Sequence, residues 1–202
     1  MSSAQESAVS GLMMLVPGTA VAVEDQGVLI MGPPKSGKSS VAYGLLREPN
    51  TRLVSDRSVI VREYDDGLWM GGGEDYVMHL PPDLHAIFPE FIERHMSVED
   101  IASFPIADLV QESTQPGAIL SLCLFVEWAP SRPTALVFVD PDACRALVGP
   151  LVPDGWTTAT NLWSTILKRT PCYRLDLGAD WVSIAPKGIL AHLKRLRSLP
   201  PV

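Results

Sequence analysis

Residues 28–47 constrain the fold more than any other part of the sequence, because they join a short apolar strand to a helix through a glycine loop. Residues 28–31 are all apolar and lead directly into Gly32. Residues 38–47 then carry apolar side chains at helical spacing, and Pro49 ends the pattern. A strand that turns through glycine into a helix is typical of α/β domains.

The loop between this strand and this helix, GPPKSGKS, fits the pattern G-x-x-x-x-G-K-[ST] at every fixed position. In this pattern, backbone N–H groups and the positive end of the helix surround a phosphate. The glycines allow the backbone to come close to it. The lysine reaches the β- and γ-phosphates of a nucleotide, and the hydroxyl that follows it binds Mg²⁺. An ordinary tight turn with an exposed lysine is the alternative.

We therefore predict a site for ATP or GTP with Mg²⁺, in which Lys38 also acts in catalysis and Ser39 is a metal ligand. Pro33 and Pro34 have no N–H, so residues 35–39 must supply most of the donors. The predicted nucleotide-binding residues are Gly32, Pro33, Pro34, Lys35, Ser36, Gly37, Lys38, Ser39 and Ser40.

Asp56 is the predicted partner of this loop. It comes 18 residues after Lys38, which leaves room for one helix and the strand at 52–55. We expect Asp56 at the carboxyl end of a strand near the loop, the rim at which open α/β sheets bind ligands. A carboxylate there is able to ligate Mg²⁺ or to take the proton from an attacking hydroxyl or water. A turn or capping aspartate is the alternative interpretation.

Two more acids end apolar strands, where a second metal-site acid is often found. Asp140, directly before Pro141, also has the features of a helix N-cap. Glu127 has no capping role, and a carboxylate that ends a buried strand needs a partner, so we consider it a candidate metal ligand. Arg174 is a candidate phosphate contact, with a surface salt bridge as the alternative. The four histidines show no ligand spacing and are expected at the surface.

The rest of the chain mixes strands and helices, so the predicted class is α/β with a mixed central sheet and flanking helices. We expect a flexible tail at 1–11 and a single domain at 12–202. The predicted strands are 19–23 and 28–31 as a hairpin, 52–63 with a break near Asp56, 68–70, a central strand at 118–128 that is buried on both faces, 134–140 and 172–178. Helices are predicted at 157–171 and 186–199.

Composition limits the partners. The chain has 16 Lys and Arg against 23 Asp and Glu, a net charge of −7, which argues against a basic surface for nucleic acid. Its three cysteines are widely spaced and indicate neither a disulfide framework nor a zinc site. The first residues lack the basic start of a signal peptide, and the apolar run at 12–16 is too short to cross a bilayer. We expect a cytoplasmic protein with no membrane partner.

Residues 18–61 resemble the catalytic domain of HPr kinase/phosphorylase. The shared features are a short hairpin, G-x-x-x-x-G-K-S, a helix, and a strand that ends in an acidic pair of the LVADD type, here RLVSD. Residues 122–178 are similar to a looser group of HPr-kinase-related proteins.

The resemblance implies a phosphoenolpyruvate-carboxykinase-like fold, ATP and Mg²⁺ as cofactors, and transfer of the γ-phosphoryl group to a serine hydroxyl of a peptide or protein. A small alcohol as the acceptor is an alternative. The resemblance also implies a homo-oligomer. By position, Asp56 matches the first acid of the pair, whereas Arg57 replaces the second, and residues 84–115 hold no counterpart of the family's Arg-Gly-x-Gly segment. A nucleotide-binding or partner-binding module without catalysis, and a simple NTPase, are the alternatives.

Overall fold

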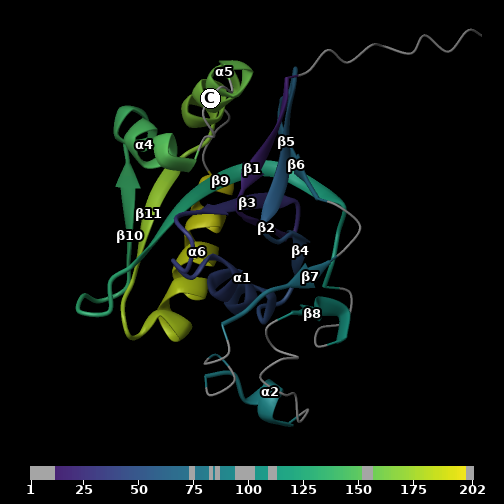
Figure 1. Cartoon of the computed structure of the whole chain (residues 1–202), viewed down its shortest axis with the longest axis vertical. Coiled ribbons are helices and arrows are strands. Elements are labelled where there is room, and N and C mark those ends of the chain that lie inside the picture. Colours follow the sequence, from purple (N-terminus) through teal and green to yellow (C-terminus); the bar gives the residue numbers. More distant parts are fainter. Residues whose placement is uncertain are drawn as a thin grey trace, which may run out of the picture.

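The computed structural model describes residues 12–72, 76–81, 84, 87–93, 103–108, 113–151 and 157–198. In this part of the chain a nine-stranded mixed sheet runs through the centre, with helices on both sides (Figure 1). Its strands are β1 (Met13–Pro17), β2 (Thr19–Val23), β3 (Gln26–Met31), β4 (Thr51–Ser55), β5 (Ser58–Tyr64), β6 (Gly67–Gly71), β9 (Gly117–Trp128), β10 (Ala135–Val139) and β11 (Cys172–Leu177). The helices are α1 (Lys38–Leu46), α2 (Pro89–Glu93), α4 (Pro141–Val148), α5 (Thr157–Arg169) and α6 (Trp181–Arg197). A separate pair consists of β7 (Val77–Met78) and β8 (Phe104–Pro105).

The long strand β9 organises the sheet. It pairs in parallel with β3 along one edge. Along the other edge it pairs with antiparallel β6 at its start and with parallel β11 at its end. The sheet continues from β3 through β2 to β4, from β6 through β5 to β1, and from β11 to β10. Because β3, β9 and β11 run in one direction, their carboxyl ends meet at one rim, where such folds bind ligands.

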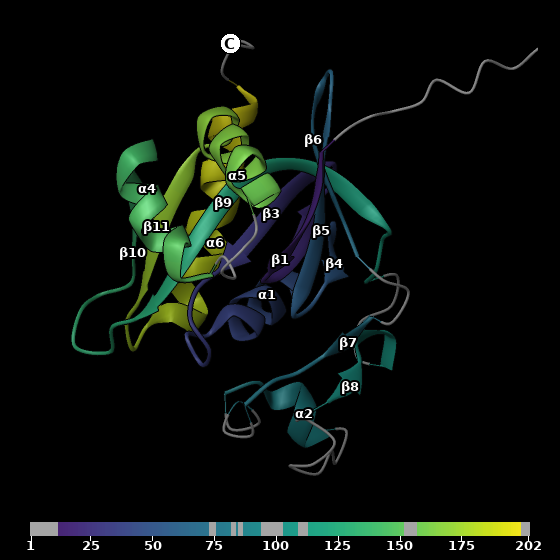
Figure 2. The ribbon, with the colours of Figure 1, turned by 45° about the horizontal axis from the view of Figure 1, so that its top comes forward.

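Two apolar cores lie on opposite faces of the sheet. Residues alternate along β3, so that Val28 and Ile30 join the core beneath α1 and α6, whereas Leu29 and Met31 join the core beneath α4 and α5. Figure 2 shows these two helix pairs on the two sides of β3 and β9. Burial on both faces explains why residues 28–31 read as a continuous apolar run.

Helix α1 is enclosed on several sides. Tyr43 stacks on Phe91 of α2 at 5.0 Å and meets Phe88 edge-on at 4.9 Å. Figure 2 shows α2, β7 and β8 as a group next to α1, away from the central sheet. Every residue of this helix from Ser40 to Leu46 is buried. The first helix after the glycine loop is therefore held firmly, which fixes the loop that leads into it.

Most predicted elements are confirmed: the hairpin of β2 and β3, helix α1, and the break at Asp56, which separates β4 from β5. Two differ. The C-terminal helix begins at Trp181 and runs through Pro186, which removes one N–H donor from the helix and whose ring lies against Gly44 of α1. Strand β9 is buried on both faces only over 122–126, and Ile119 is 49% exposed.

The expected tail at 1–11 lies outside the described residues, as do 85–86, 94–102 and 109–112. None of the helices in the described segments has both the length and the apolarity that crossing a bilayer requires.

Candidate nucleotide site

The glycine loop leaves β3 at Gly32 and enters α1 at Gly37, and both glycines are required there. Gly32 has φ 146° and Gly37 has φ 100°, values that other residues rarely adopt. A Cβ on Gly32 would lie 2.7 Å from the carbonyl oxygen of Val126, and one on Gly37 would lie 2.8 Å from Leu177. Gly37 is the N-cap of α1 and offers no side-chain cap, so the first N–H groups of the helix are open to a ligand.

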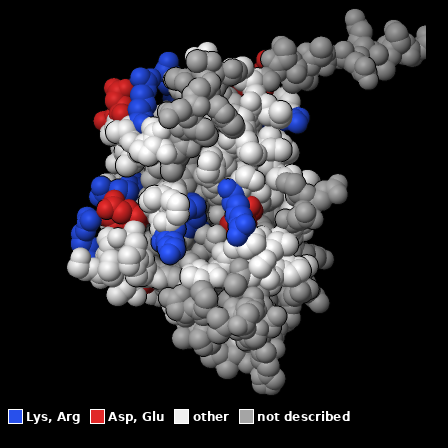
Figure 3. Space-filling view, viewed as in Figure 1, with Lys and Arg blue, Asp and Glu red and all other residues white. Residues whose placement is uncertain are grey.

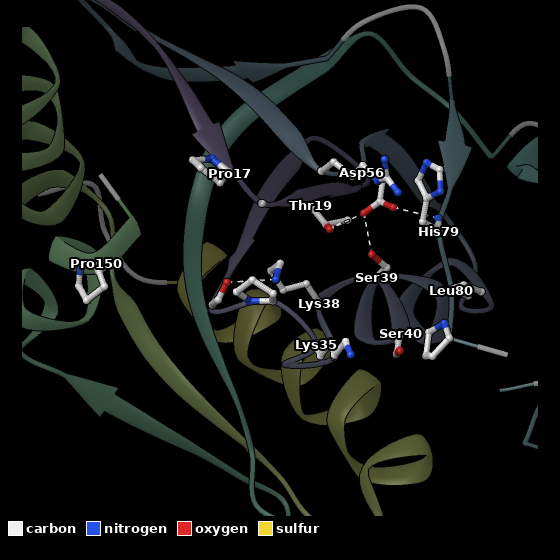
Figure 4. A pocket seen from close by; sticks show the side chains of 16 residues that line it. Pro17, Thr19, Lys35, Lys38, Ser39, Ser40, Asp56, His79, Leu80 and Pro150 are labelled. Atoms are coloured by element: carbon white, nitrogen blue, oxygen red, sulfur yellow. Dashed lines mark hydrogen bonds between the residues drawn. The ribbon is translucent and has the colours of Figure 1, made fainter. Parts of the chain in front are cut away.

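Lys38 folds back over the loop. Its Nζ donates to the carbonyl oxygen of Gly32 at 3.0 Å (Figure 4). It also donates to the carbonyl oxygen of Pro33 at 2.8 Å. Burial lowers the pKa of Lys38 from its ordinary value, and the nearby Asp56 carboxylate partly offsets this effect. The amine is therefore positioned over the loop before any phosphate arrives.

Asp56 lies just beyond β4, and the structure brings it to Ser39 as the spacing predicts. Its Oδ1 accepts hydrogen bonds from Ser39 Oγ at 2.8 Å and from Thr19 Oγ1 at 2.6 Å. Its Oδ2 accepts from the backbone N–H of His79 at 3.0 Å. Figure 4 shows these donors around the carboxylate, each from a different part of the chain. Both carboxylate oxygens are thus held.

Sequence reasoning missed two of these contacts. Thr19 reads as an ordinary strand residue, and nothing local to it points to Asp56. His79 contributes through its backbone N–H, which every residue except proline possesses, so no residue type signals it.

A pocket of about 940 Å³ opens between the loop and Asp56. It contains seven of the nine predicted nucleotide-binding residues, whereas Pro33 and Ser36 are not among the described lining residues. Its lining includes three cations, Lys35, Lys38 and Arg57, against one acid, Asp56. In the space-filling view, Lys and Arg side chains lie in several separate places on the face shown, some of them beside Asp or Glu (Figure 3). In a chain of net charge −7, the local excess of positive charge in the pocket lining favours an anionic ligand.

Arg57 also has an unusual backbone, with φ 74°. Its carbonyl oxygen accepts from the N–H of Gly18 at 3.0 Å, which fixes the turn after Asp56. The side chain is exposed and lines the pocket beside Asp56. Non-glycine residues held at positive φ cluster at functional sites, and this one lies next to the central carboxylate.

Neither Glu127 nor Arg174 is among the described residues that line the pocket. Glu127 is 51% exposed and pairs with Arg132 at 3.7 Å and Arg174 at 3.8 Å. Arg174 also makes two bonds, of 2.7 and 3.1 Å, to the buried Asp176, and they raise the pKa of Arg174. Glu127 is therefore paired with two arginines, and Arg174 forms salt bridges with Glu127 and Asp176. Asp140 caps α4 by accepting from two backbone N–H groups.

The donor set fits Mg²⁺. A serine hydroxyl and a carboxylate are hard oxygen donors, and Mg²⁺ in nucleotide sites takes one or two protein ligands besides phosphates and water. Across the described segments there is no cluster of three His, Cys, Asp or Glu side chains suited to a metal. Ser39 and Asp56 are thus the residues that could hold Mg²⁺ together with a nucleotide.

Comparison with solved structures finds the HPr(Ser) kinase/phosphatase from Coxiella burnetii, with a TM-score of 0.55 and 9% sequence identity. The match covers 92% of this chain and 99% of that chain. The fold is that of an HPr kinase. No protein-family model and no curated protein matches the sequence. The HPr-kinase-like architecture, a mixed central sheet with flanking helices, confirms the predicted fold class, and at this identity the likeness concerns the fold alone.

Proposed function

We propose that the protein binds ATP or GTP with Mg²⁺ in the pocket between the glycine loop and Asp56 and transfers the γ-phosphoryl group to a hydroxyl. One observation carries the proposal: the hydroxyl after the loop lysine, Ser39 Oγ, lies 2.8 Å from the carboxylate predicted to act with it. This is the pair of oxygen donors that a nucleotide-bound Mg²⁺ requires. An HPr-kinase-like fold is consistent with it.

Each residue has a role in this proposal. The backbone N–H groups of 35–39 and the open end of α1 hold the phosphates. Lys38 exchanges its two loop carbonyls for phosphate oxygens. Ser39 and Asp56 would hold Mg²⁺, which would neutralise charge on the phosphates. Asp56 also takes the proton of the attacking hydroxyl, on a serine of a peptide or protein or on a small alcohol.

A nucleotide-binding module without transfer is the second candidate, and Arg57 favours it. This cation stands where the resembling family has its second acid, so the pocket has one carboxylate instead of two. A positive charge beside Asp56 strengthens the hold on a nucleotide without adding a metal ligand. Product detection separates the two candidates.

Calorimetry with Mg-ATP and Mg-GTP, followed by mass spectrometry of peptides and metabolites incubated with the protein and Mg-ATP, tests the proposal. We expect the intact protein to bind nucleotide and to yield a product 80 Da heavier. Absence of nucleotide binding would overturn both candidates. Tight binding without product from any acceptor leaves the non-catalytic module.

A further inference from the structure

We propose that Thr19 is a positioning residue whose hydroxyl holds Asp56 in the orientation in which it meets Ser39 and Mg²⁺. The inference rests on the proposed nucleotide and Mg²⁺ site and adds to it a residue that is absent from the glycine loop and from the acidic turn.

The first support is the contact itself. Thr19, the first residue of β2, is fully buried. Its Oγ1 lies 2.6 Å from Asp56 Oδ1, the same oxygen that Ser39 contacts at 2.8 Å. A hydrogen bond to an ionised carboxylate is among the stronger ones in proteins, and it also satisfies a buried hydroxyl. The two hydroxyls therefore define the place of one carboxylate oxygen from two sides.

The second support is the register of the sheet. Strands β2 and β4 shift register between Ala20 and Val21, so that Ala20 faces Ser55 while Val21 faces Leu53. Such irregularities re-aim side chains and occur next to active sites. Here the shift brings the residue before Ala20 level with the residue after Ser55, which are Thr19 and Asp56.

The third support is a backbone hydrogen bond next to the contact between Thr19 and Asp56. The N–H of Gly18 donates to the carbonyl oxygen of Arg57 at 3.0 Å. A Cβ on Gly18 would lie 2.7 Å from the carbonyl oxygen of Ile30, so only glycine brings the chain this close. Gly18 and Thr19 thus hold two consecutive residues of the turn. If Ser39 turns to Mg²⁺, Thr19 and the N–H of His79 still hold the carboxylate.

The test compares ATP affinity with Mg²⁺ and with EDTA, by calorimetry, in near-isosteric variants. Thr19→Val removes the hydroxyl, and we expect it to lower the ratio of the two affinities by about tenfold, the effect of one hydrogen bond to a charged group. Thr19→Ser restores the donor and should stay within about threefold of the unchanged protein. Thr51→Val is the matched control, because Thr51 is buried and its hydroxyl has no partner among the described residues.

The ratio separates positioning from general damage, since a loosened fold lowers both affinities together. If Thr19→Val is unfolded by circular dichroism, Thr19→Ala takes its place in the same measurement. A ratio equal to that of the unchanged protein overturns the role of Thr19 and leaves the proposed function standing. An equal loss in Thr19→Ser also overturns it, because a variant that keeps the hydroxyl would then lose as much as one that lacks it. Absence of ATP binding by the unchanged protein overturns the proposed function itself, and this inference with it.

Discussion

Lys38 and Asp56 place opposite charges in one pocket, and each is held in place by contacts of its own. Lys38 donates to two loop carbonyls, and Asp56 accepts from two hydroxyls and one backbone N–H. Groups held in this way lose little freedom when a ligand binds. Substitutions at these two positions should therefore change ligand binding and chemistry more than folding.

Lys38→Ala should abolish nucleotide binding measurable by calorimetry, because it removes the cation above the loop. Lys187→Ala is the matched control, since Lys187 lies exposed on α6, outside the pocket lining. We expect the control to bind like the unchanged protein. Equal affinities in the two variants would contradict the placement of the nucleotide at the loop.

Asp56→Asn should still bind nucleotide, with a lower affinity in the presence of Mg²⁺, and should lower the rate of transfer by at least about 100-fold, the usual contribution of a general base. Glu127→Gln makes the same chemical change at an exposed acid and should leave the rate unchanged. Product formation is followed by mass spectrometry over time. Unchanged turnover in Asp56→Asn would remove this residue from the mechanism.

Nucleotide affinity should fall in alkaline solution, and the fall should begin below pH 10.5, the ordinary pKa of lysine. Burial lowers the pKa of Lys38, so the free protein loses this charge earlier than a free lysine does, whereas the phosphate requires the charged form. Calorimetry between pH 7 and the onset of unfolding measures the fall. Lys38→Arg should show no such decline, because arginine stays protonated.

At the scale of elements, the contact of α1 with α6 keeps the glycine loop in place. A Cβ on Gly44 would lie 3.2 Å from Pro186 and 3.6 Å from Trp181, so the two helices meet where one has no side chain. Close packing of this kind tolerates no added volume.

Gly44→Val should destabilise the protein by about 1–3 kcal/mol through overpacking. Gly188→Ala, the companion change on α6, has open space around its Cβ and should stabilise by about 0.5–1 kcal/mol through helix propensity. Urea unfolding measures both free energies. A stabilising effect of Gly44→Val would contradict the close contact between α1 and α6.

The three cysteines meet where β9, β11 and α4 come together, and all are buried as free thiols. Burial raises the pKa of Cys144 to about 12. The pKa of Cys172 is raised by its hydrogen bond with Cys123 and by burial. Since the thiolate is the reactive form, native protein at pH 8 should resist iodoacetamide, whereas unfolded protein should label three times. Mass spectrometry counts the labels, and rapid native labelling would contradict this burial.

At the scale of the whole molecule, the proposed nucleotide pocket is lined by residues from several separate elements. The loop, the turn at 56–57 and His79 contribute from different elements, so a ligand that bridges them should stabilise the native state. Mg-ATP at 100 times its dissociation constant should raise Tm by about 5–10 °C. Differential scanning fluorimetry measures the shift, and Lys38→Ala should show none.

The sequence by itself determined what is local. The strand, glycine loop and helix lie within 21 contiguous residues, and the conformation of the loop depends on its own glycines, so the motif and the hairpin before it were predictable. The break at Asp56 and the capping alternative for Asp140 were also readable, because each depends on the residues next to it.

The tertiary structure decided which distant groups reach the pocket. Thr19 and His79 contact Asp56 across 37 and 23 residues, one through a register shift in the sheet and the other through a backbone N–H. Glu127 lies at the end of a strand of the same sheet, as the apolar run before it indicates, but its carboxylate pairs with Arg132 and Arg174. Long-range contacts depend on how strands pair and in which register, and one residue of shift turns a side chain to the other face of the sheet.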